Sequence, residues 1–434
     1  MKIEKILSKK LPEDWKFVSF QEVAEIITGN TPSRKKAENY GEGIPWVKPP
    51  DLDQVNPIFR TTETLSEIGQ TQARVLPKNS VLVCCIGSIG RVGIAGTELA
   101  TNQQINSLIF NETIVDPKFG YFYCQSIQEI FKSKAEQAVV KILNKSQFSK
   151  ISIPLPPLSE QRKIVEILDQ ADALRTKRAE SDRLSDRILP ALFIKMFGDP
   201  IINPMRWPTK NLEEITDIKN IRNGISPSHK GTYSEKVLTL SAITQGKFNA
   251  NAHKVAGFSK KPSKHKLVRK NDFLVCRGNG NINLVGQGKF PNNDYDDLYF
   301  PDTIIAVPID YSICQREYLE TIWSHEVVRQ QIETLARTTN GTYKINQSSL
   351  LSMKILLPPP DLQEKFCLDT HKLHQVLALQ SITVSKIEKL FQTLLHQAFT
   401  GTLTASWRTA HMTELLQEME HQAKQLNLDL SPTP

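Results

Sequence analysis

Cysteine is scarce in this 434-residue chain and is not arranged for a metal or redox site. The six cysteines include no Cys-x-x-Cys pair, the spacing that a structural zinc site or a dithiol redox motif needs. His371 and His374 lie three residues apart on an expected helix, and we expect them not to bind a metal. We therefore expect reduced, mostly buried thiols and no metal site.

Long apolar runs are also missing. No stretch of about 20 apolar residues is available to cross a bilayer. The first residues, MKIEKILSKKLPEDW, lack the apolar core of a signal peptide. These features predict no membrane association and a cytoplasmic location.

Motifs for nucleotide binding and catalysis are absent as well. No Gly-x-x-x-x-Gly-Lys-Ser/Thr occurs, and Gly87, Gly90 and Gly93 lack the spacing and the later acidic residue of a dinucleotide fingerprint. The segment Lys48 to Asp51 has two central prolines but not the flanks of an amino-methyltransferase tetrapeptide, and no Gly-x-Ser-x-Gly elbow is present. We expect no cofactor in this chain and no catalysis by it alone.

Acidic residues are outnumbered by basic ones. The chain has 54 Lys and Arg against 46 Asp and Glu, a formal net charge of +8. This excess favours a polyanionic partner, although a basic surface can also serve only to keep a protein soluble.

A long repeat is the main feature that the sequence does contain. Five elements recur roughly 200 residues further along the chain, in the same order. They are Trp15 and Trp207, Gly29–Ser33 and Gly224–Ser228, Lys78–Cys84 and Lys270–Cys276, Pro156-Pro157 and Pro358-Pro359, and the long helical segments Ser159–Phe197 and Asp361–Phe399. A period this long indicates a duplicated domain, and two copies related by an approximate two-fold axis suit a partner such as duplex DNA. The repeat favours a protein that reads DNA over a catalyst.

The length and the repeat together predict the domain organisation, because a chain of this size exceeds a single core. We expect a mixed α/β fold in which two duplicated globular modules with β-sheet cores are separated by two long antiparallel coiled-coil helices, with pseudo-two-fold symmetry. The expected parts are module 1 (1–157), a first helix (158–200), module 2 (201–359), a second helix (360–404) and an amphipathic tail (405–434).

Apolar, β-branched runs between Gly, Pro and Asn residues predict strands, and longer amphipathic runs predict helices within the modules. The expected strands lie near Ser80–Ile86, Gln104–Phe110, Lys150–Leu155, Phe273–Cys276, Thr303–Val307 and Ser352–Leu357. The expected helices lie near Tyr121–Phe131 and Tyr318–Leu335.

The two long helices have recognisable start signals. Ser159 and Asp361 follow proline steps at positions suited to helix caps. In the second helix the expected apolar stripe consists of Phe366, Leu373, Val376, Ile387, Leu390 and Leu394. Pro190 has no counterpart in the second helix and predicts a kink or an early end near Leu189. The helices most simply pack on each other; the alternative is that each lies on its own module.

Candidate DNA-binding residues in module 1 fall in three loops that mix cations, hydroxyls, amides and aromatics with glycine or proline. The first loop holds Ser33, Arg34, Lys35, Lys36, Tyr40 and Lys48; the second Ser88, Arg91, Gln103 and Gln104; the third Lys141 and Lys145. Arg can bond guanine bidentately and Gln adenine, while glycine lets the backbone approach a groove. The structural alternative is that these residues form turns and solvated charge runs.

Module 2 has equivalent loops with different residues. Lys254–Lys270 carries seven Lys or Arg and no acid, which favours phosphate contact. The candidates are Ser228, His229, Lys230, Lys264 and Lys266; then Arg277, Asn279, Asn281 and Asn283; then Arg337, Thr339, Asn340 and Lys344. Because the two copies differ most in these loops, we expect each module to read its own sequence.

This organisation resembles the specificity subunits of type I restriction–modification systems. The resemblance extends over the full chain and is most specific at Pro154–Ile164 and Leu356–Lys365, each of which leads into a long helix that closes on Met196–Gly198 or Ala398–Gly401. Pro190 and the tail depart from it.

The resemblance implies two target-recognition domains, each reading one half of a bipartite, asymmetric site in double-stranded DNA. It also implies docking of two modification (methyltransferase) subunits and of restriction subunits, with the S-adenosylmethionine, ATP and Mg²⁺ sites on those partners. A flipped adenine would be delivered to a partner methyltransferase, and the half-sites would lie about one helical turn apart.

Two alternatives remain open from the sequence. The chain could be a self-sufficient DNA-modifying enzyme with an unrecognised site, which S-adenosylmethionine binding by the isolated chain would support. It could also be a scaffold that does not read sequence, which unchanged site choice after mutation of Arg91 or Arg277 would support.

Overall fold

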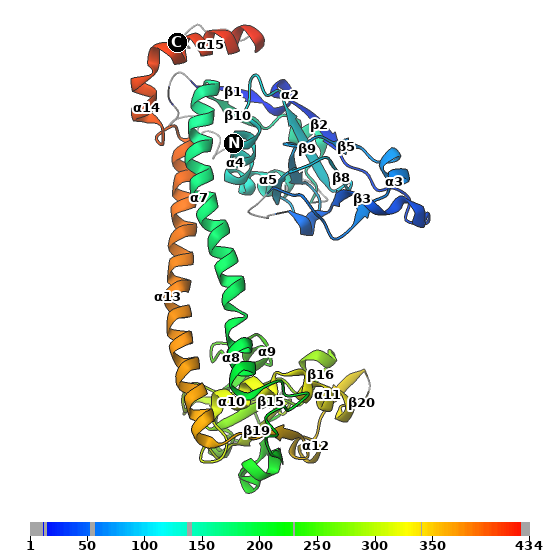
Figure 1. Ribbon diagram of the computed structural model, residues 1–434, viewed down its shortest axis with the longest axis vertical. Helices are drawn as coiled ribbons and strands as arrows, with labels where there is room; N and C mark the ends of the chain where they lie inside the picture. Colours follow the sequence, from blue (N-terminus) through cyan, green and yellow to red (C-terminus); the bar gives the residue numbers. More distant parts are fainter. Residues whose placement is uncertain are drawn as a thin grey trace. The chain divides into compact units, whose positions relative to one another are not determined.

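The computed structural model describes residues 12, 15–52, 57–136, 141–228, 231–339 and 341–426. It divides into two compact units, one made of 1–181 and 381–434 and the other of 182–380. Each unit therefore contains one module together with parts of both long helices (Figure 1). In each unit the module and the long helices share one apolar core, so they fold together.

The described residues of unit 1 form three sheets. One four-stranded sheet has the order β2-β9-β6-β7, a second, whose strands lie between β2 and β9 in the chain, has the order β4-β3-β8-β5, and β1 pairs with β10. The strands are β1 (Lys16–Ser19), β2 (Ala24–Thr28), β3 (Tyr40–Val47), β4 (Thr64–Leu65), β5 (Val75–Leu76), β6 (Val81–Cys84), β7 (Val92–Ile94), β8 (Leu99–Thr101), β9 (Ile105–Phe110) and β10 (Ser152–Leu155). The helices of the module are α2 (Phe20–Val23), α3 (Glu67–Thr71), α4 (Pro117–Ser126), α5 (Gln128–Glu136) and α6 (Lys145–Ser149).

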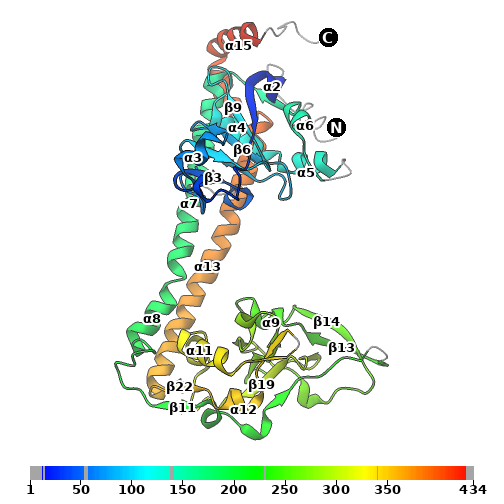
Figure 2. The same ribbon diagram turned by 90° about the vertical axis from the view of Figure 1, so that its right-hand side faces the viewer.

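Unit 2 repeats the central sheet and the two-stranded sheet of this topology, and its other described strands form two three-stranded sheets, β14-β13-β18 and β16-β21-β20. Its four-stranded sheet has the order β12-β19-β15-β17, and β11 pairs with β22 as β1 does with β10 (Figure 2). The strands are β11 (Thr209–Asn211), β12 (Arg222–Asn223), β13 (Tyr233–Leu238), β14 (His253–Phe258), β15 (Asp272–Cys276), β16 (Gly278–Asn279), β17 (Gly288–Lys289), β18 (Leu298–Tyr299), β19 (Ile304–Pro308), β20 (Arg337–Thr339), β21 (Thr342–Lys344) and β22 (Lys354–Leu356). The helices of this module are α9 (Ser241–Thr244), α10 (Arg316–Trp323), α11 (Glu326–Leu335) and α12 (Gln347–Leu351).

The repeated glycine turn has the same packing role in both units. A Cβ atom on Gly29 would lie 2.2–2.4 Å from atoms of Thr101 and Asn102, and one on Gly224 would lie 2.0 Å from the Pro301 carbonyl oxygen. The amide of Gly29 donates to Ile105, and that of Gly224 to Ile304, at 3.0 and 3.1 Å. Only glycine lets the chain pass this close to its neighbour, which explains why both copies keep it.

The first long helix is broken and the second is continuous. Helix α7 (Leu158–Ser185) is followed by a turn and then α8 (Ile188–Phe197), whereas α13 (Pro360–Phe399) runs for 40 residues. The proline at 190 has no N–H for the carbonyl of Asp186, and its ring crowds that carbonyl, so the break falls four residues before it. The predicted interruption near Leu189 is confirmed.

The predicted helix caps are wrong. Helix α7 begins at Leu158 and α13 at Pro360, so Ser159 and Asp361 are the second residues of their helices. Instead, a buried glutamine one turn later fixes each start. Gln161 accepts from the Asp116 amide at 2.9 Å and donates to the carbonyls of Ile114 and Pro156 at 2.8 and 2.9 Å. The sequence around this glutamine recurs in the second copy because the same set of hydrogen bonds recurs there.

Gln363 makes the same three bonds in unit 2. It accepts from the Gln315 amide at 2.9 Å and donates to the carbonyls of Ile313 and Pro358 at 3.2 and 2.8 Å. Both glutamines have no solvent exposure. Each ties a module loop to the proline step that starts its long helix, and each satisfies backbone groups that burial would otherwise leave unpaired.

Within each unit the two long helices run antiparallel, as predicted. In unit 1, Arg175 pairs with Glu388 at 2.9 Å. In unit 2, Ser185 contacts Gln380 at 3.5 Å, and Phe193 and Phe366 have ring centroids 5.6 Å apart. As the residue number increases along α7 and α8, the residue number of the contact on α13 decreases, which is the pattern of antiparallel helices.

The helices also pack on the modules, so the two packing alternatives are not exclusive. Phe391, Leu395, Ala398 and Phe399 belong to the core of module 1. Phe366 belongs to the core of module 2, with residues of α8. The predicted stripe is wrong in part, because Val376 and Leu390 are about half exposed. The module, and not only the partner helix, selects which face of α13 is buried.

The tail forms two helices instead of the single one expected, α14 (Ala405–Ala410) and α15 (Met412–Leu426). Arg408 of α14 is buried and bonds Glu160 at 2.8 Å, and Thr404 bonds the same carboxylate at 2.6 Å. The indole N–H of Trp15 donates to Glu160 at 3.1 Å. The tail is therefore part of unit 1, held at the start of α7.

The expected strands are present in both modules, but the two expected module helices are each interrupted. The segment near Tyr121–Phe131 is divided between α4 and α5 at Ile127, and the segment near Tyr318–Leu335 between α10 and α11 at Ser324 and His325. Among the described residues, no helix combines the length and the apolar character that crossing a membrane requires.

Candidate nucleic-acid interface

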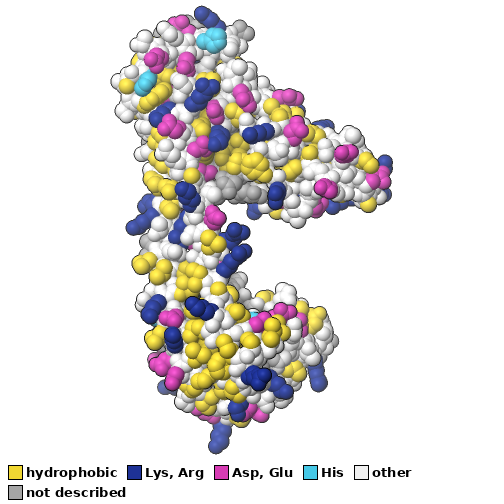
Figure 3. All heavy atoms as spheres, in the orientation of Figure 1, with side chains coloured by type: hydrophobic (Ala, Val, Ile, Leu, Met, Phe, Trp, Pro, Cys, Tyr) yellow, Lys and Arg dark blue, Asp and Glu magenta, His cyan; other side chains and the backbone are white. Residues whose placement is uncertain are grey.

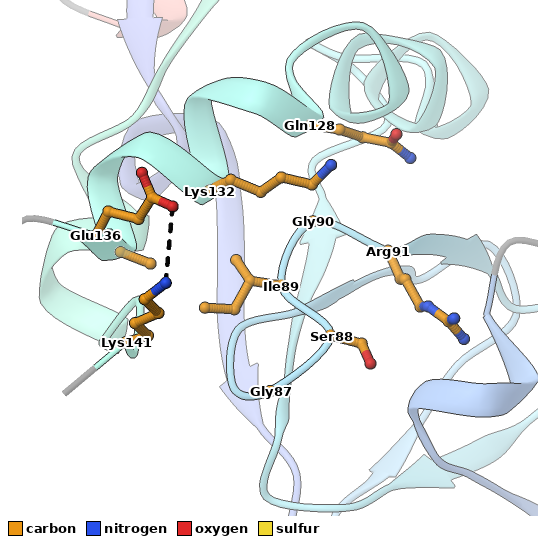
Figure 4. Close-up of a pocket in the computed structure, with 10 residues that line it drawn as sticks. Gly87, Ser88, Ile89, Gly90, Arg91, Gln128, Lys132, Glu136 and Lys141 are labelled. Atoms are coloured by element: carbon orange, nitrogen blue, oxygen red, sulfur yellow. Dashed lines mark ion pairs between the residues drawn. The ribbon is translucent and has the colours of Figure 1, made fainter. Parts of the chain in front are cut away.

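The glycine loop of module 1 connects β6 to β7 and forms one wall of an open hollow. Gly87 and Gly90 have φ of 77° and 89°, and a Cβ atom on Gly90 would lie 3.0 Å from the Gln128 carbonyl oxygen. The loop can therefore lie against α5 only with glycine at this position. The hollow between them has a volume of about 450 Å³ (Figure 4).

This hollow brings together three of the predicted residues and one that sequence reasoning missed. Ser88, Arg91 and Lys141 line it, and Lys132 extends from α5 towards the glycine loop (Figure 4). Lys132 bonds Glu129 at 2.6 Å, and Lys141 lies 3.9 Å from Glu136. Since these pairs are largely exposed, phosphate oxygens can replace the carboxylates at low cost. The sequence gives no sign that α5 faces the glycine loop.

The amide cluster beside the loop is mainly structural. Gln104 accepts from the Asn102 side chain at 2.9 Å and donates to the Ile86 carbonyl at 3.4 Å. Gln103 is exposed and accepts from the Thr31 hydroxyl. Gln104 thus positions the glycine loop, while Gln103 lies at the surface with the Thr31 turn.

Two cations of the first loop share one carboxylate. Arg34 bonds Glu63 at 2.8 Å, and Lys48 bonds its other oxygen. The guanidinium of Arg34 also lies 4.9 Å from the ring centroid of Tyr40. The bond from Lys48 is the main reason that the pKa of Glu63 falls below its ordinary value of 4.5, and Arg34 adds to it while burial opposes it. These cations are already paired, which lowers their availability to phosphate.

The remaining candidates of module 1 are at the surface. Ser33, Lys35 and Lys36 are exposed on the turn before β3, and Lys145 is exposed on the first turn of α6. Exposed lysine and serine side chains on turns can follow a phosphate backbone without losing existing bonds.

Module 2 places four candidates on one small sheet of order β16-β21-β20. Asn279 pairs with Tyr343, while Lys344 lies opposite both Gly278 and Arg337. Thr339 ends β20. Like charges directly opposite in a ladder are unfavourable, so Arg337 and Lys344 together create a site that favours an anion. The tertiary fold joins β16 to β21, whose paired residues are 64 and 66 positions apart and lie in separate loops of the sequence.

The asparagine run forms turns. Asn279 accepts from the amide of Asn281, and Asn281 accepts from that of Asn283, at 2.9 and 3.0 Å. Arg277 donates to the Asp302 carbonyl at 3.3 Å. The structural alternative thus holds for the side-chain oxygens of Asn279 and Asn281, while the exposed Asn283 keeps its side chain at the surface.

The basic run of module 2 lies beside a second hollow, of about 430 Å³, which Lys264 lines with Arg222 and Arg269. Arg222 bonds the buried Asp272 at 2.5 and 3.0 Å. Lys266 donates to the Asn223 carbonyl at 2.6 Å, and burial, helped by the Arg222 charge, lowers its pKa. Lys264 faces solvent, whereas Lys266 is a structural link.

Ser228 is half-buried, and its amide donates to Gly257 at 2.8 Å. His229, Lys230 and Asn340 lie outside the described residues. On the face drawn in Figure 3, Lys and Arg side chains lie interspersed with Asp and Glu.

The thiols are protected. Burial raises the pKa of Cys85 and Cys314 to about 12 and that of Cys276 to about 11. Thiols with such pKa values are protonated at neutral pH and are poor nucleophiles and poor metal ligands. Across the ranges that the structure describes, no group of three or more His, Cys, Asp or Glu side chains could hold a metal ion.

Comparison with known proteins gives consistent matches. The family model of the type I restriction modification DNA specificity domain matches residues 12–184. The EcoKI specificity subunit of Escherichia coli is 24% identical over 92% of this chain and 91% of its own length. The MjaIX specificity subunit of Methanocaldococcus jannaschii is 24% identical over 91% of this chain and 94% of its own length.

A solved structure shares the fold. A chain from work on complex assembly and conformational transition of the type I R-M system aligns with 91% of this chain and all of its own length, with a TM-score of 0.57 and 18% identity. The family model and the near full-length relatives indicate the same family, and the solved structure has the same fold. This chain is therefore similar, over most of its length, to the specificity subunits of type I restriction–modification systems.

Proposed function

We propose that module 1 (1–157) and module 2 (201–359) are target-recognition domains that each read one half of a bipartite, asymmetric DNA site. The helices of 158–200 and 360–404 act as the spacer between them, and 405–434 completes the first unit. The observation that carries this proposal is the repeat of one sheet topology with a different set of loop residues beside each copy. The scaffold is kept where both copies do the same task, and the loops differ where each reads its own bases.

In module 1, Ser88 and Arg91 read base edges from the glycine loop, and Lys132 and Lys141 hold phosphates on either side. This assignment rests on the shared hollow that these four residues line. Lys35, Lys36 and Lys145 add backbone contacts, because such contacts fix register without carrying sequence information.

In module 2, Arg277 and Asn283 read bases, and Arg337 and Lys344 hold phosphates. The opposed cations on β20 and β21 support the phosphate role. Lys264 contributes from the neighbouring basic run. The two half-sites lie about one helical turn apart, since both modules contact one face of the duplex.

The chain is the non-catalytic subunit of its complex. It docks two modification subunits and the restriction subunits, and S-adenosylmethionine, ATP and Mg²⁺ bind to those partners. The complex methylates adenine in the bound site and cleaves unmodified DNA. It acts in the cytoplasm, where it has access to chromosomal DNA.

Methylome sequencing with and without this chain tests the proposal. We expect a bipartite methylated motif that disappears on deletion, and an unchanged methylome would refute it. Exchange of residues 1–157 for the first module of another specificity subunit should change one half of the motif only. Loss of both halves would show that the domain division is wrong. Binding of S-adenosylmethionine by the isolated chain would instead support a self-sufficient enzyme.

A further inference from the structure

Unit 2 contains a hollow of about 730 Å³ that none of the DNA-binding candidates lines. It lies between α8, α10 and the early turns of α13. Pro190, Phe193, Phe248 and Phe290 are its main apolar lining residues, and the three phenylalanine side chains are themselves largely buried. Cavities of this size that combine apolar walls with a few polar groups are typical of small-molecule sites.

The equivalent place in unit 1 is filled. The bonds of the two buried glutamines make Asp116 and Gln315 equivalent, so Tyr121 and Phe122 of α4 correspond to Glu320 and Thr321 of α10. Phe122 is buried, and its ring lies 6.2 Å from that of Phe391.

Phe391 also occupies this place in unit 1. The Arg175 guanidinium covers its ring, 4.1 Å from the ring centroid. The counterpart of Phe391 in unit 2 is Leu189, which lines the hollow. The hollow therefore exists because rings in one copy are replaced by smaller side chains in the other.

Thr370 is one of the residues that line the hollow, and its hydroxyl oxygen is buried. Thr370 is 2% exposed, and among the described residues its hydroxyl has no hydrogen-bond partner. The equivalent residue of unit 1 is Leu168, which is fully buried in the core. A buried hydroxyl without a partner is unfavourable unless a ligand or water satisfies it. The exchange of a leucine for a threonine at a cavity wall thus points to a bound polar group.

The charge of the lining selects the kind of ligand. The lining contains three cationic side chains, Lys247, Lys289 and Arg316, and two acidic ones, Glu317 and Glu320, of which Lys289 and Glu320 pair at 3.7 Å. The net formal charge of the lining is therefore +1 when His325 and His374 are neutral. Burial, with the nearby Lys247 charge, lowers the pKa of His374.

We propose that this hollow binds one planar, singly anionic small molecule of up to nucleoside size, with its ring against the phenylalanine walls and an acceptor bonded to the Thr370 hydroxyl. One molecule binds per chain, because only unit 2 has the smaller side chains. The site is separate from the DNA-reading loops, so it does not depend on the function proposed above.

Fluorescence titration with 8-anilinonaphthalene-1-sulfonate, an aromatic monoanion with a planar naphthalene ring, tests this proposal on the full chain. Thr321→Phe introduces the residue that unit 1 has and should weaken binding at least tenfold. Thr370→Leu removes the hydroxyl and adds the bulk of Leu168, and should weaken it at least threefold. Thr334→Phe places the same ring on exposed α11 and should leave the affinity unchanged.

The outcomes separate the possibilities. Absence of saturable binding at one site per chain overturns the proposal. Equal affinity in wild type, Thr321→Phe and Thr370→Leu also overturns it, since the probe would then be bound elsewhere. Thermal melting checks the fold of each variant, and if Thr321→Phe does not fold, Thr370→Leu decides. DNA affinity measured on the same variants should stay at the wild-type level, so a failure of the DNA-reading proposal would be seen separately.

Discussion

The buried charge cluster at the start of α7 gives the strongest prediction. Glu160 has no solvent exposure and accepts from Trp15, Thr404 and Arg408 at 3.1, 2.6 and 2.8 Å. Arg408→Ala removes its only cationic partner in the described part of the chain and leaves the carboxylate in the core. Removal of one partner of a buried pair costs about 3–5 kcal/mol, because the remaining charge is desolvated without compensation.

The loss should appear as a shift in the unfolding of unit 1. For a unit of this size, about 1 kcal/mol moves the melting temperature by roughly 2–4 °C, so we expect a decrease of about 6–20 °C. Hydrogen exchange followed by mass spectrometry assigns the transition to unit 1, with faster exchange in α7, α14 and α15. Differential scanning calorimetry measures the size of the shift.

Two further variants make this experiment decisive. Lys163→Ala breaks an exposed pair with Glu166 and should cost less than about 0.5 kcal/mol. The double variant Glu160→Gln with Arg408→Met removes both charges and should recover much of the loss, because no unpaired charge remains. Equal melting temperatures for Arg408→Ala and Lys163→Ala would refute the reasoning.

Three other predictions follow from the sites. Lys132→Ala should weaken binding to all DNA sequences alike and reduce the salt slope of the affinity by about 1, as measured by fluorescence anisotropy at several salt concentrations. Glu63→Gln should strengthen DNA binding, because it releases Arg34 and Lys48. In the wild-type protein the pKa of Glu63 is lowered in the folded state, so the stability that this carboxylate contributes is present above pH 4.5 and is lost as the pH falls through the lowered pKa. Gln363→Ala should destabilise unit 2 by about 2–4 kcal/mol in chemical denaturation, because one amide and two carbonyls lose their partner.

Matched controls are available for each of these. Lys163→Ala removes a lysine remote from the loops and should leave the salt slope unchanged. Glu25→Gln neutralises an exposed carboxylate of β2, and a gain in DNA affinity equal to that of Glu63→Gln would show a general charge effect. Gln392→Ala removes an exposed glutamine of α13, and a cost equal to that of Gln363→Ala would contradict the proposed role of the buried one.

Local sequence patterns predicted the elements but not their ends. The strands near Val81–Cys84 and Asp272–Cys276 are confirmed because they are apolar, β-branched runs that suit a buried sheet. The caps at Ser159 and Asp361 are wrong because Gln161 and Gln363 bond the backbone groups around each helix start. Such bonds join residues about 45 positions apart, which no local pattern contains.

The sequence likewise predicted one part of the candidate site and not the other. The residue types identified surface loops rich in cations and amides, and Ser88, Arg91 and Lys141 do line one hollow. Sequence reasoning could not find Lys132, because its position depends on how α5 packs against the glycine loop. Nor could it separate the exposed Lys264 from Lys266, whose ammonium is used on a backbone carbonyl.

The sequence by itself determined the duplication, the broken first helix and the shared turn glycine, because backbone chemistry and repeat order act through neighbouring residues. Proline at 190 interrupts a helix, and glycine at 29 and 224 permits a close approach, wherever the rest of the chain lies. Only the tertiary structure decided that the helix halves and the tail join the module cores, and that unit 2 keeps a hollow where unit 1 packs rings. Those outcomes depend on contacts between distant segments, and packing energy is set by the shapes that meet there.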